Sequence, residues 1–221
     1  MRSLAGFHPG VDAVLESTIL ALRGAGAVVV DDLVLERPAD YWSSSFEVLL
    51  YEFKHSLNAY LARLPAPHNT LDLNGIIAFN RVNAERELVH FGQDILEAAN
   101  AKGPLSDDAY KRALASVQRA ARLHGIDALV SEHRLDVLVS PTAGPAWTID
   151  HVNGDHYLGG SASYPAVAGY PHLTVPMGAV ADLPVGLSIY GAPSARSSLF
   201  EVGRAVELLR SWRQSPTLLI R

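Results

Sequence analysis

Apolar residues recur at intervals of three and four along much of the chain, and this spacing predicts a series of amphipathic helices. The first is a helix of about 14 residues with an apolar face between Val11 and Leu22, where Pro9 suits the first turn and Gly24 and Gly26 can end the helix. Further helices are predicted over residues 41–64, 74–91, 93–101, 106–124, 164–169 and 196–212. Ser106 is a suitable cap for one of them, and Gly125 is suited to close its last turn.

Short runs of β-branched and apolar residues predict strands between these helices. The predicted strands cover residues 27–35, 135–140, 172–178 and 184–191. Segments 137–140, 173–176 and 185–190 are expected to belong to one sheet. If another part of that sheet were missing, an unpaired strand edge and an uncovered apolar face would remain. We therefore expect self-association, or binding of the complementary part.

Composition indicates a packed globular protein. Hydrophobic residues make up 48% of the chain and charged residues only 19%, which is too apolar and too weakly charged for disorder. The formal net charge of −5 offers no basic surface for a run of phosphates, so nucleic acid is not an expected partner.

The chain contains no cysteine, which excludes disulfides, thiolate zinc sites, iron–sulfur clusters and a cysteine nucleophile within its 221 residues. This composition suits the cytoplasm, which is the expected location. The sequence has no apolar run of about 18 residues, and no secretion signal at its start, so we expect no membrane span and no membrane partner.

Residues 141–193 differ in composition from the rest of the chain. They contain seven prolines and eight glycines, and their only acidic or basic residues are Asp150, Asp155 and Asp182. A stretch this apolar is not typical of a flexible linker. Its turns are therefore expected to lie against the body of the protein.

Three runs of this region carry a resemblance: DVLVSPTAGPAW (136–147), NGDHYLGGSASYPAVAGYPHLTVPMG (153–178) and LPVGLSIYGAPSARSSLFEVGRAVE (183–207). They resemble the C-terminal portion of amidase-signature hydrolases, most of all the peptide amidase and related bacterial amidase branch. Upstream, FHPGVDAVLESTILALRGAGAVVVDD (7–32) and AERELVHFGQDILEAANAKGPLSDDAYKRAL (84–114) are similar to middle segments of the same family.

The resemblance implies an α/β fold, a twisted mixed β-sheet flanked by helices, of which residues 1–221 form a single incomplete domain. It also implies hydrolysis of a small-molecule or peptide amide by the complete enzyme, with no metal and no cofactor. Family members use a lysine, a serine in a cis peptide and a nucleophilic serine, the serines lying near a Gly-Ser-Ser-Gly-Gly type stretch in the N-terminal half. That catalytic half is absent here.

No catalytic residue can be carried onto this sequence. Its lysines, Lys54, Lys102 and Lys111, lie in predicted helices without the family's surroundings. The run Gly159-Gly160-Ser161-Ala162-Ser163 suggests a glycine-flanked nucleophile, but Ser163 stands where a nucleophile elbow needs a small glycine-like residue. We expect the chain alone to be inactive.

The resemblance places part of the substrate pocket in the same low-charge region. The predicted substrate-binding residues are Ala146, Trp147, Tyr157, Leu158 and Ser161. Core packing is the alternative for the rings of Trp147 and Tyr157, and for Tyr170. For Ser161 and Ser163 the alternative is to cap the helix over 164–169.

A metal site and a histidine-based triad are two further alternatives. His151, Asp155 and His156 are possible metal ligands by residue type, but their spacing matches no known site, and we interpret them as a solvated loop near the substrate entrance. The other histidines are scattered, and a triad is defined by geometry rather than by sequence.

Two functions from different classes follow. In the first, the chain is the C-terminal part of an amide hydrolase and supplies scaffold and one pocket wall. In the second, it is a non-catalytic scaffold or partner-binding module derived from a truncated or split amidase gene.

Overall fold

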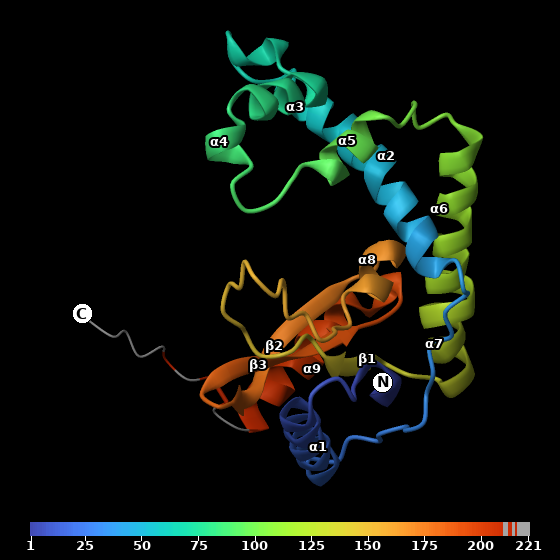
Figure 1. Ribbon diagram of the computed structural model, residues 1–221. Helices are drawn as coiled ribbons and strands as arrows, with labels where there is room; N and C mark the ends of the chain where they lie inside the picture. Colours follow the sequence, from blue (N-terminus) through green and yellow to red (C-terminus); the bar gives the residue numbers. More distant parts are fainter. Residues whose placement is uncertain (210–211, 214, 216–221) are drawn as a thin grey trace. The chain divides into compact units, whose positions relative to one another are not determined.

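The computed structural model describes residues 1–209, 212–213 and 215. Two compact units are present, one formed by residues 1–37 and 118–221 and the other by residues 38–117. The helices, shown in Figure 1, are α1 (Pro9–Gly24), α2 (Tyr41–Leu61), α3 (Leu73–Val82), α4 (Ala84–Glu87), α5 (Asp94–Asn100), α6 (Asp108–Ala121), α7 (Asp127–His133), α8 (Ser163–Ala168) and α9 (Arg196–Leu209). None of these described helices is both long and apolar enough to cross a membrane.

The first unit contains a three-stranded sheet formed by β1 (Leu138–Pro141), β2 (His172–Val180) and β3 (Leu183–Tyr190). The strand order is β1-β3-β2, and both pairs of described strands are antiparallel. A two-residue turn joins β2 to β3, and Ala181 and Asp182 both have positive φ in it, as a tight hairpin of this kind requires. The predicted α/β architecture with flanking helices is confirmed.

Alternation along the strands gives the sheet one apolar and one polar face. The apolar face carries Val175, Met177, Leu187 and Ile189, all buried in one core with residues of α1 and α9. Helix α9 approaches the sheet closely at Gly203, where a Cβ atom would lie 2.6 Å from Leu173 Cδ2. The expectation of an uncovered apolar sheet face is wrong, because α1 and α9 cover that face.

Residues 27–35 form no strand, contrary to the prediction. The segment is held by its side chains instead: Leu33 and Leu35 are buried, and Asp31 pairs with Arg2 and Arg23. Val28 is almost fully exposed. The β-branched residues of segment 27–35 would favour a strand only beside a partner strand. None of the described strands pairs with this segment.

Gly125 does not end a helix. Helix α6 begins at Asp108 rather than at Ser106 and continues through a π-helical turn, η3 (Arg122–Ile126), into α7. Gly125 is buried inside that turn, where a Cβ atom would lie 2.5 Å from the carbonyl oxygen of Ala120. The helical path ends only at Arg134, which adopts a left-handed conformation.

The remaining helix predictions differ mainly at their ends. The predicted helix over 74–91 is divided at Asn83 into α3 and α4. Helix α2 stops at Leu61, three residues before the predicted end. The prediction for 196–212 is confirmed up to Leu209, and residues 210–211 lie outside the described part of the chain.

The second unit is helical and has a small apolar core of Leu50, Leu73, Ile77 and Ala99. Polar side chains fasten its helices together. Lys54 Nζ on α2 donates to the carbonyl oxygens of Asn100 (2.7 Å) and Lys102 (2.5 Å), which lie at the end of α5. Such carbonyls have no partner within their own helix, so the lysine caps α5.

Candidate functional site

The predicted substrate-binding residues lie on the loop that joins β1 to α8. Both ends of this loop are fixed beside the sheet. The amide of Thr142 donates to the carbonyl of Gly186 at 2.8 Å, and the amide of Ser161 donates to the carbonyl of Thr142 at 3.1 Å. Ala143 and Gly160 form an isolated β-bridge. Residues 144–159 therefore form a closed loop whose ends meet at the sheet edge.

Trp147 and Tyr157 come together on this loop. Their ring centroids are 6.3 Å apart with an interplanar angle of 58°. The indole Nε1 of Trp147 donates to Asp155 Oδ1 at 2.5 Å. Trp147 is 41% exposed and Tyr157 is 60% exposed, so neither ring belongs to the core of the described structure. Within the described residues, the two rings therefore pair on the surface of the loop rather than in the core.

The other predicted residues divide into two groups. Ala146 and Leu158 are exposed on the same loop as the ring pair. Ser161 lies at the base of the loop and is only 1% exposed, and its Oγ has no hydrogen-bond partner among the described residues. Helix α8 begins at Ser163 with Ala162 as its N-cap residue, so Ser161 does not cap it.

The two glycines before Ser161 serve the base of the loop. A Cβ atom on Gly160 would lie 2.7 Å from the carbonyl oxygen of Thr142 and 2.8 Å from the hydroxyl of Tyr157. Gly159 has φ of 154° and lies against the ring of Phe7. Glycine is required at both positions by this close packing. The two glycines before Ser161 are therefore explained by the structure of the loop, with no need for a nucleophile there.

The acidic residues of the loop are engaged in its own structure. Asp150 accepts hydrogen bonds from the amides of Val152 and Asn153 and from the side chain of Asn153, and these bonds hold the pKa of its carboxyl below the ordinary value. Asp155 holds the Trp147 indole. Within the described part of the chain, no three histidine, aspartate or glutamate residues are grouped to hold a metal ion.

Tyr170, the third aromatic residue considered from the sequence, makes a hydrogen bond to a different element from that of the Trp147–Tyr157 pair. It is half-buried, and its hydroxyl donates to Asp127 Oδ2 at 2.8 Å. Burial, together with this carboxylate, raises the pKa of Tyr170. Tyr170 lies just before β2, and its hydrogen bond links this segment to Asp127 at the start of α7. We interpret this contact as structural.

A serine–histidine pair on the polar face of the sheet was not predicted from the sequence. Ser188 Oγ lies 2.7 Å from His172 Nε2 and 2.9 Å from Thr142 Oγ1. Ser188 is fully buried, and partial burial of the imidazole lowers the pKa of His172. Ser188 is the buried member of the pair and His172 is exposed, and their hydrogen bond links β2 to β3. The two residues meet only through the register of β2 and β3, which no local motif reveals.

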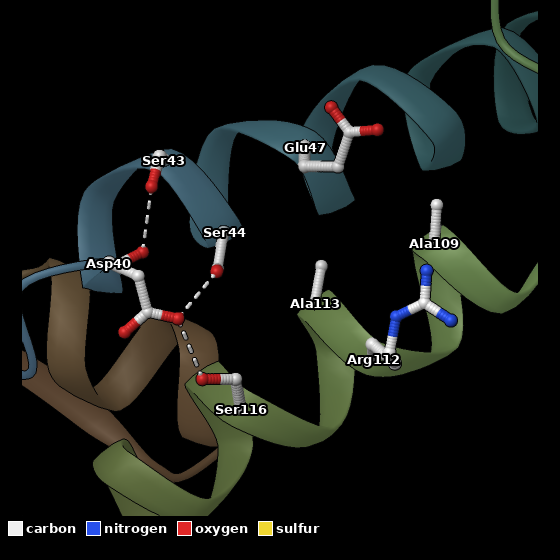
Figure 2. Close-up of a pocket in the computed structure, with 8 residues that line it drawn as sticks. All are labelled: Asp40, Ser43, Ser44, Glu47, Ala109, Arg112, Ala113 and Ser116. Atoms are coloured by element: carbon white, nitrogen blue, oxygen red, sulfur yellow. Dashed lines mark hydrogen bonds between the residues drawn. The ribbon is translucent and has the colours of Figure 1, made fainter.

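The second unit holds an open pocket of about 430 Å³ between α2 and α6 (Figure 2). Its lining residues are Asp40, Ser43, Ser44, Glu47, Ala109, Arg112, Ala113 and Ser116. Asp40 Oδ2 accepts from the hydroxyls of Ser44 (3.0 Å) and Ser116 (3.2 Å), and Glu47 pairs with Lys102 outside the lining. The lining of this pocket includes serines and the carboxylates of Asp40 and Glu47 but no histidine or lysine, so it does not contain the lysine that the family resemblance implies for catalysis.

Residues 2–199 match the family model described as Amidase. This chain belongs to the amidase family. The resemblance seen in its sequence is confirmed, and the segments that carried it lie within the matched range except for residues 200–207 of the third run.

Three relatives show how much of an amidase the chain represents. A probable amidase of Arabidopsis thaliana is 31% identical over 214 residues, which cover 94% of this chain and 38% of the relative. Native peptide amidase from Stenotrophomonas maltophilia is 40% identical with a TM-score of 0.83, covering 93% of this chain and 41% of that one. Peptide amidase in complex with the competitive inhibitor chymostatin is 40% identical with a TM-score of 0.88, covering 99% and 44%. The amidase chain described here therefore spans less than half the length of these relatives, and it matches their C-terminal portion.

Proposed function

We propose that this chain supplies the C-terminal part of an enzyme that hydrolyses carbon–nitrogen amide bonds. In this role it provides scaffold and one wall of the pocket for a small-molecule or peptide amide. The likeness to peptide amidase carries the proposal, because it extends over 99% of this chain but only 44% of the peptide amidase chain. A cytoplasmic location, with neither a membrane nor a nucleic acid as partner, is part of the same proposal.

The lysines of the chain support a division of labour with an N-terminal part. A lysine that acts as a base must lie within hydrogen-bond reach of the hydroxyl it activates. Lys54 donates to two carbonyl oxygens and Lys102 pairs with Glu47, so the contacts of both ammonium groups are to partners other than a serine hydroxyl. Lys111 lies 3.9 Å from Asp108. The lysine and both serines of the amide-cleaving machinery are therefore proposed to come from the N-terminal part of the enzyme.

The loop with Ala146, Trp147, Tyr157, Leu158 and Ser161 is the proposed pocket wall. Trp147 and Tyr157 present exposed aromatic rings, which suit the apolar part of an amide substrate. Ser161 suits its polar part. A buried hydroxyl without a partner costs about 1–3 kcal/mol, and this cost would be relieved by a hydrogen bond from a group brought by the substrate or by the N-terminal part.

The proposed wall is tested in a complemented enzyme, made by co-expressing this chain with the N-terminal portion of peptide amidase. The measurement is kcat/KM for a set of peptide amides that differ in the residue next to the amide. Trp147→Ala and Tyr157→Ala should change the preference within the set by about tenfold, with little change in unfolding midpoint. Phe200→Ala, on the exposed surface of α9, is the matched control. If the two loop variants lower stability and leave the preference unchanged, the wall is assigned to the wrong residues.

A second candidate function, a non-catalytic partner-binding module, is favoured by one surface of the helical unit. Trp42, Phe46, Leu49 and Phe53 recur along α2 at intervals of four, three and four, and all are exposed. We name these residues the α2 stripe. This spacing is the one by which two helices pair along an apolar seam. Sedimentation velocity of the wild-type chain and of Phe46→Gln/Phe53→Gln separates the functions: association that depends on the α2 stripe and persists without any complemented activity favours the module.

A further inference from the structure

The loop over residues 144–159 exposes several large apolar side chains. Besides the ring pair and Leu158, it presents Ile149 and Val152, which are 85% and 91% exposed. Large apolar side chains exposed together on one loop are typical of a place where a ligand or partner binds. The ends of the loop are fastened to the sheet through Thr142 and Ser161, so this apolar surface has a fixed base.

One residue fixes the orientation of the larger ring. An indole N–H that donates to a carboxylate forms a charge-assisted hydrogen bond, which is stronger than a neutral one. Asp155 Oδ1 accepts this bond from Trp147 at 2.5 Å, across eight residues of the loop. Without it, the Trp147 ring would be free to turn about its side-chain torsions, and its arrangement with Tyr157 would not be defined.

The same carboxylate also sets the sign of charge at the loop. Between residues 141 and 193 the chain contains no lysine or arginine, and with His151 and His156 neutral the only charged residues of the loop are Asp150 and Asp155. Asp150 is engaged by three hydrogen bonds within its own turn. An anionic ligand placed on the rings would therefore lie beside negative charge with no cation on this segment to offset it.

We infer that Asp155 is a positioning residue that fixes the Trp147–Tyr157 ring pair as the binding wall for an aromatic group on a neutral or positively charged amide, and that it disfavours carboxylates. The inference rests on the proposed function and names the substrate class of that wall. It has a consequence for turnover. Hydrolysis of an amide leaves a carboxylate, so the same charge that admits the substrate weakens binding of the acid product.

The test uses the chain alone and three probes that share one ring: phenylalaninamide, N-acetylphenylalaninamide and N-acetylphenylalanine, which are cationic, neutral and anionic. Binding is measured from saturation transfer in proton NMR spectra over a concentration series. The two amides should bind the wild-type chain about fivefold more tightly than the acid, or better. No transfer to the aromatic protons of either amide, or equal binding of all three probes, would overturn the inference.

Two variants separate the two roles of Asp155. Asp155→Asn keeps an oxygen that accepts the indole hydrogen bond and removes the charge, so it should bind all three probes alike. Asp155→Leu removes the charge and also the acceptor, so binding of all three should fall about fivefold or more below that of Asp155→Asn. Asp182→Asn, in the β2–β3 turn, is the charge-matched control and should behave as wild type. If Asp155→Leu binds like wild type while its unfolding midpoint is unchanged, Asp155 does not position the ring.

These results are independent of catalysis. A chain that binds the probes as described, but gives no activity with an N-terminal amidase portion, would keep the ring wall and reject the proposed function. A complemented enzyme that is active while the chain shows no preference among the probes would reject the role of Asp155 and keep the proposed function.

Discussion

The sheet unit and the helical unit of this amidase chain bury their apolar residues to different degrees. In the sheet unit, α1 and α9 cover the apolar face of the sheet, and the polar face joins Ser188, His172 and Thr142 by hydrogen bonds. The helical unit has a small core and depends on polar fastenings such as Lys54, while the α2 stripe remains exposed. The comparison teaches that the sheet unit covers the apolar face of its sheet with its own helices, whereas the helical unit leaves the α2 stripe exposed.

The largest effect on stability is expected in the sheet core. Leu187 on the central strand is fully buried beneath α1 and α9. Leu187→Ala should lower the free energy of unfolding by about 3–5 kcal/mol, because it removes buried methyl groups and leaves a cavity. Urea unfolding measures the loss. A loss below about 1 kcal/mol would show that this core relaxes easily and that the sheet unit is no better packed than the helical unit.

The edge of the same sheet is expected to respond to pH in a polypeptide that begins at Met1. The Met1 ammonium donates to the carbonyl of Val139 on β1 at 2.6 Å, and burial is the main cause that lowers its pKa from 8.0 to about 6. Between pH 6 and pH 8 the unfolded chain therefore binds more protons than the folded chain. Stability should rise with pH across this interval by about 2–3 kcal/mol and be complete above pH 8. An N-acetylated chain should lack this rise, and an equal rise in both forms would assign it to another group.

A smaller and more local effect is expected in the helical unit. Lys54→Met removes the two hydrogen bonds that the lysine donates to carbonyl oxygens at the end of α5. This change should lower the free energy of unfolding by about 1–3 kcal/mol. Because the loss lies in one unit, amide hydrogen exchange should accelerate in residues 94–100 and remain slow in β3. Equal acceleration in both units would show that they unfold as one, which would contradict the contrast between them.

The smallest effect on stability is expected at the α2 stripe. Phe46 is exposed, so Phe46→Gln should change the free energy of unfolding by less than about 0.5 kcal/mol. The same variant should reduce the fluorescence of a bound hydrophobic dye, whereas Phe200→Gln on α9 serves as the control. Strong destabilisation by Phe46→Gln would mean that this side chain already has a partner within the chain.

Most of the fold could be predicted from local patterns. The apolar spacing of α1 and α9 and the turn residues around β2 and β3 act within a few residues, and these elements form where the sequence predicts. The strand prediction for residues 27–35 was wrong because a strand needs a partner strand, and local composition does not show whether one is present. The prediction that Gly125 ends a helix was wrong because glycine is needed there for close packing against the Ala120 carbonyl.

The residues of the candidate site could be proposed from the sequence, but the hydrogen bonds between them could not. Low charge and large rings, together with the family position, indicated Trp147 and Tyr157, which the structure brings together. Asp155 was considered only as a possible metal ligand or as part of a solvated loop, and its bond to the indole depends on the path of the loop. The pairing of Ser188 with His172 depends on strand register, so no pattern along the chain could reveal it.

The most direct test of the account is the release of ammonia from a peptide amide by this chain, by the N-terminal portion of peptide amidase, and by the two combined. The account predicts no turnover above background by either part and turnover by the combination, rising with added chain until the N-terminal portion is saturated. Turnover by this chain alone, abolished when one of its own serines is replaced by alanine, would contradict the account, because it would place the nucleophile in these 221 residues.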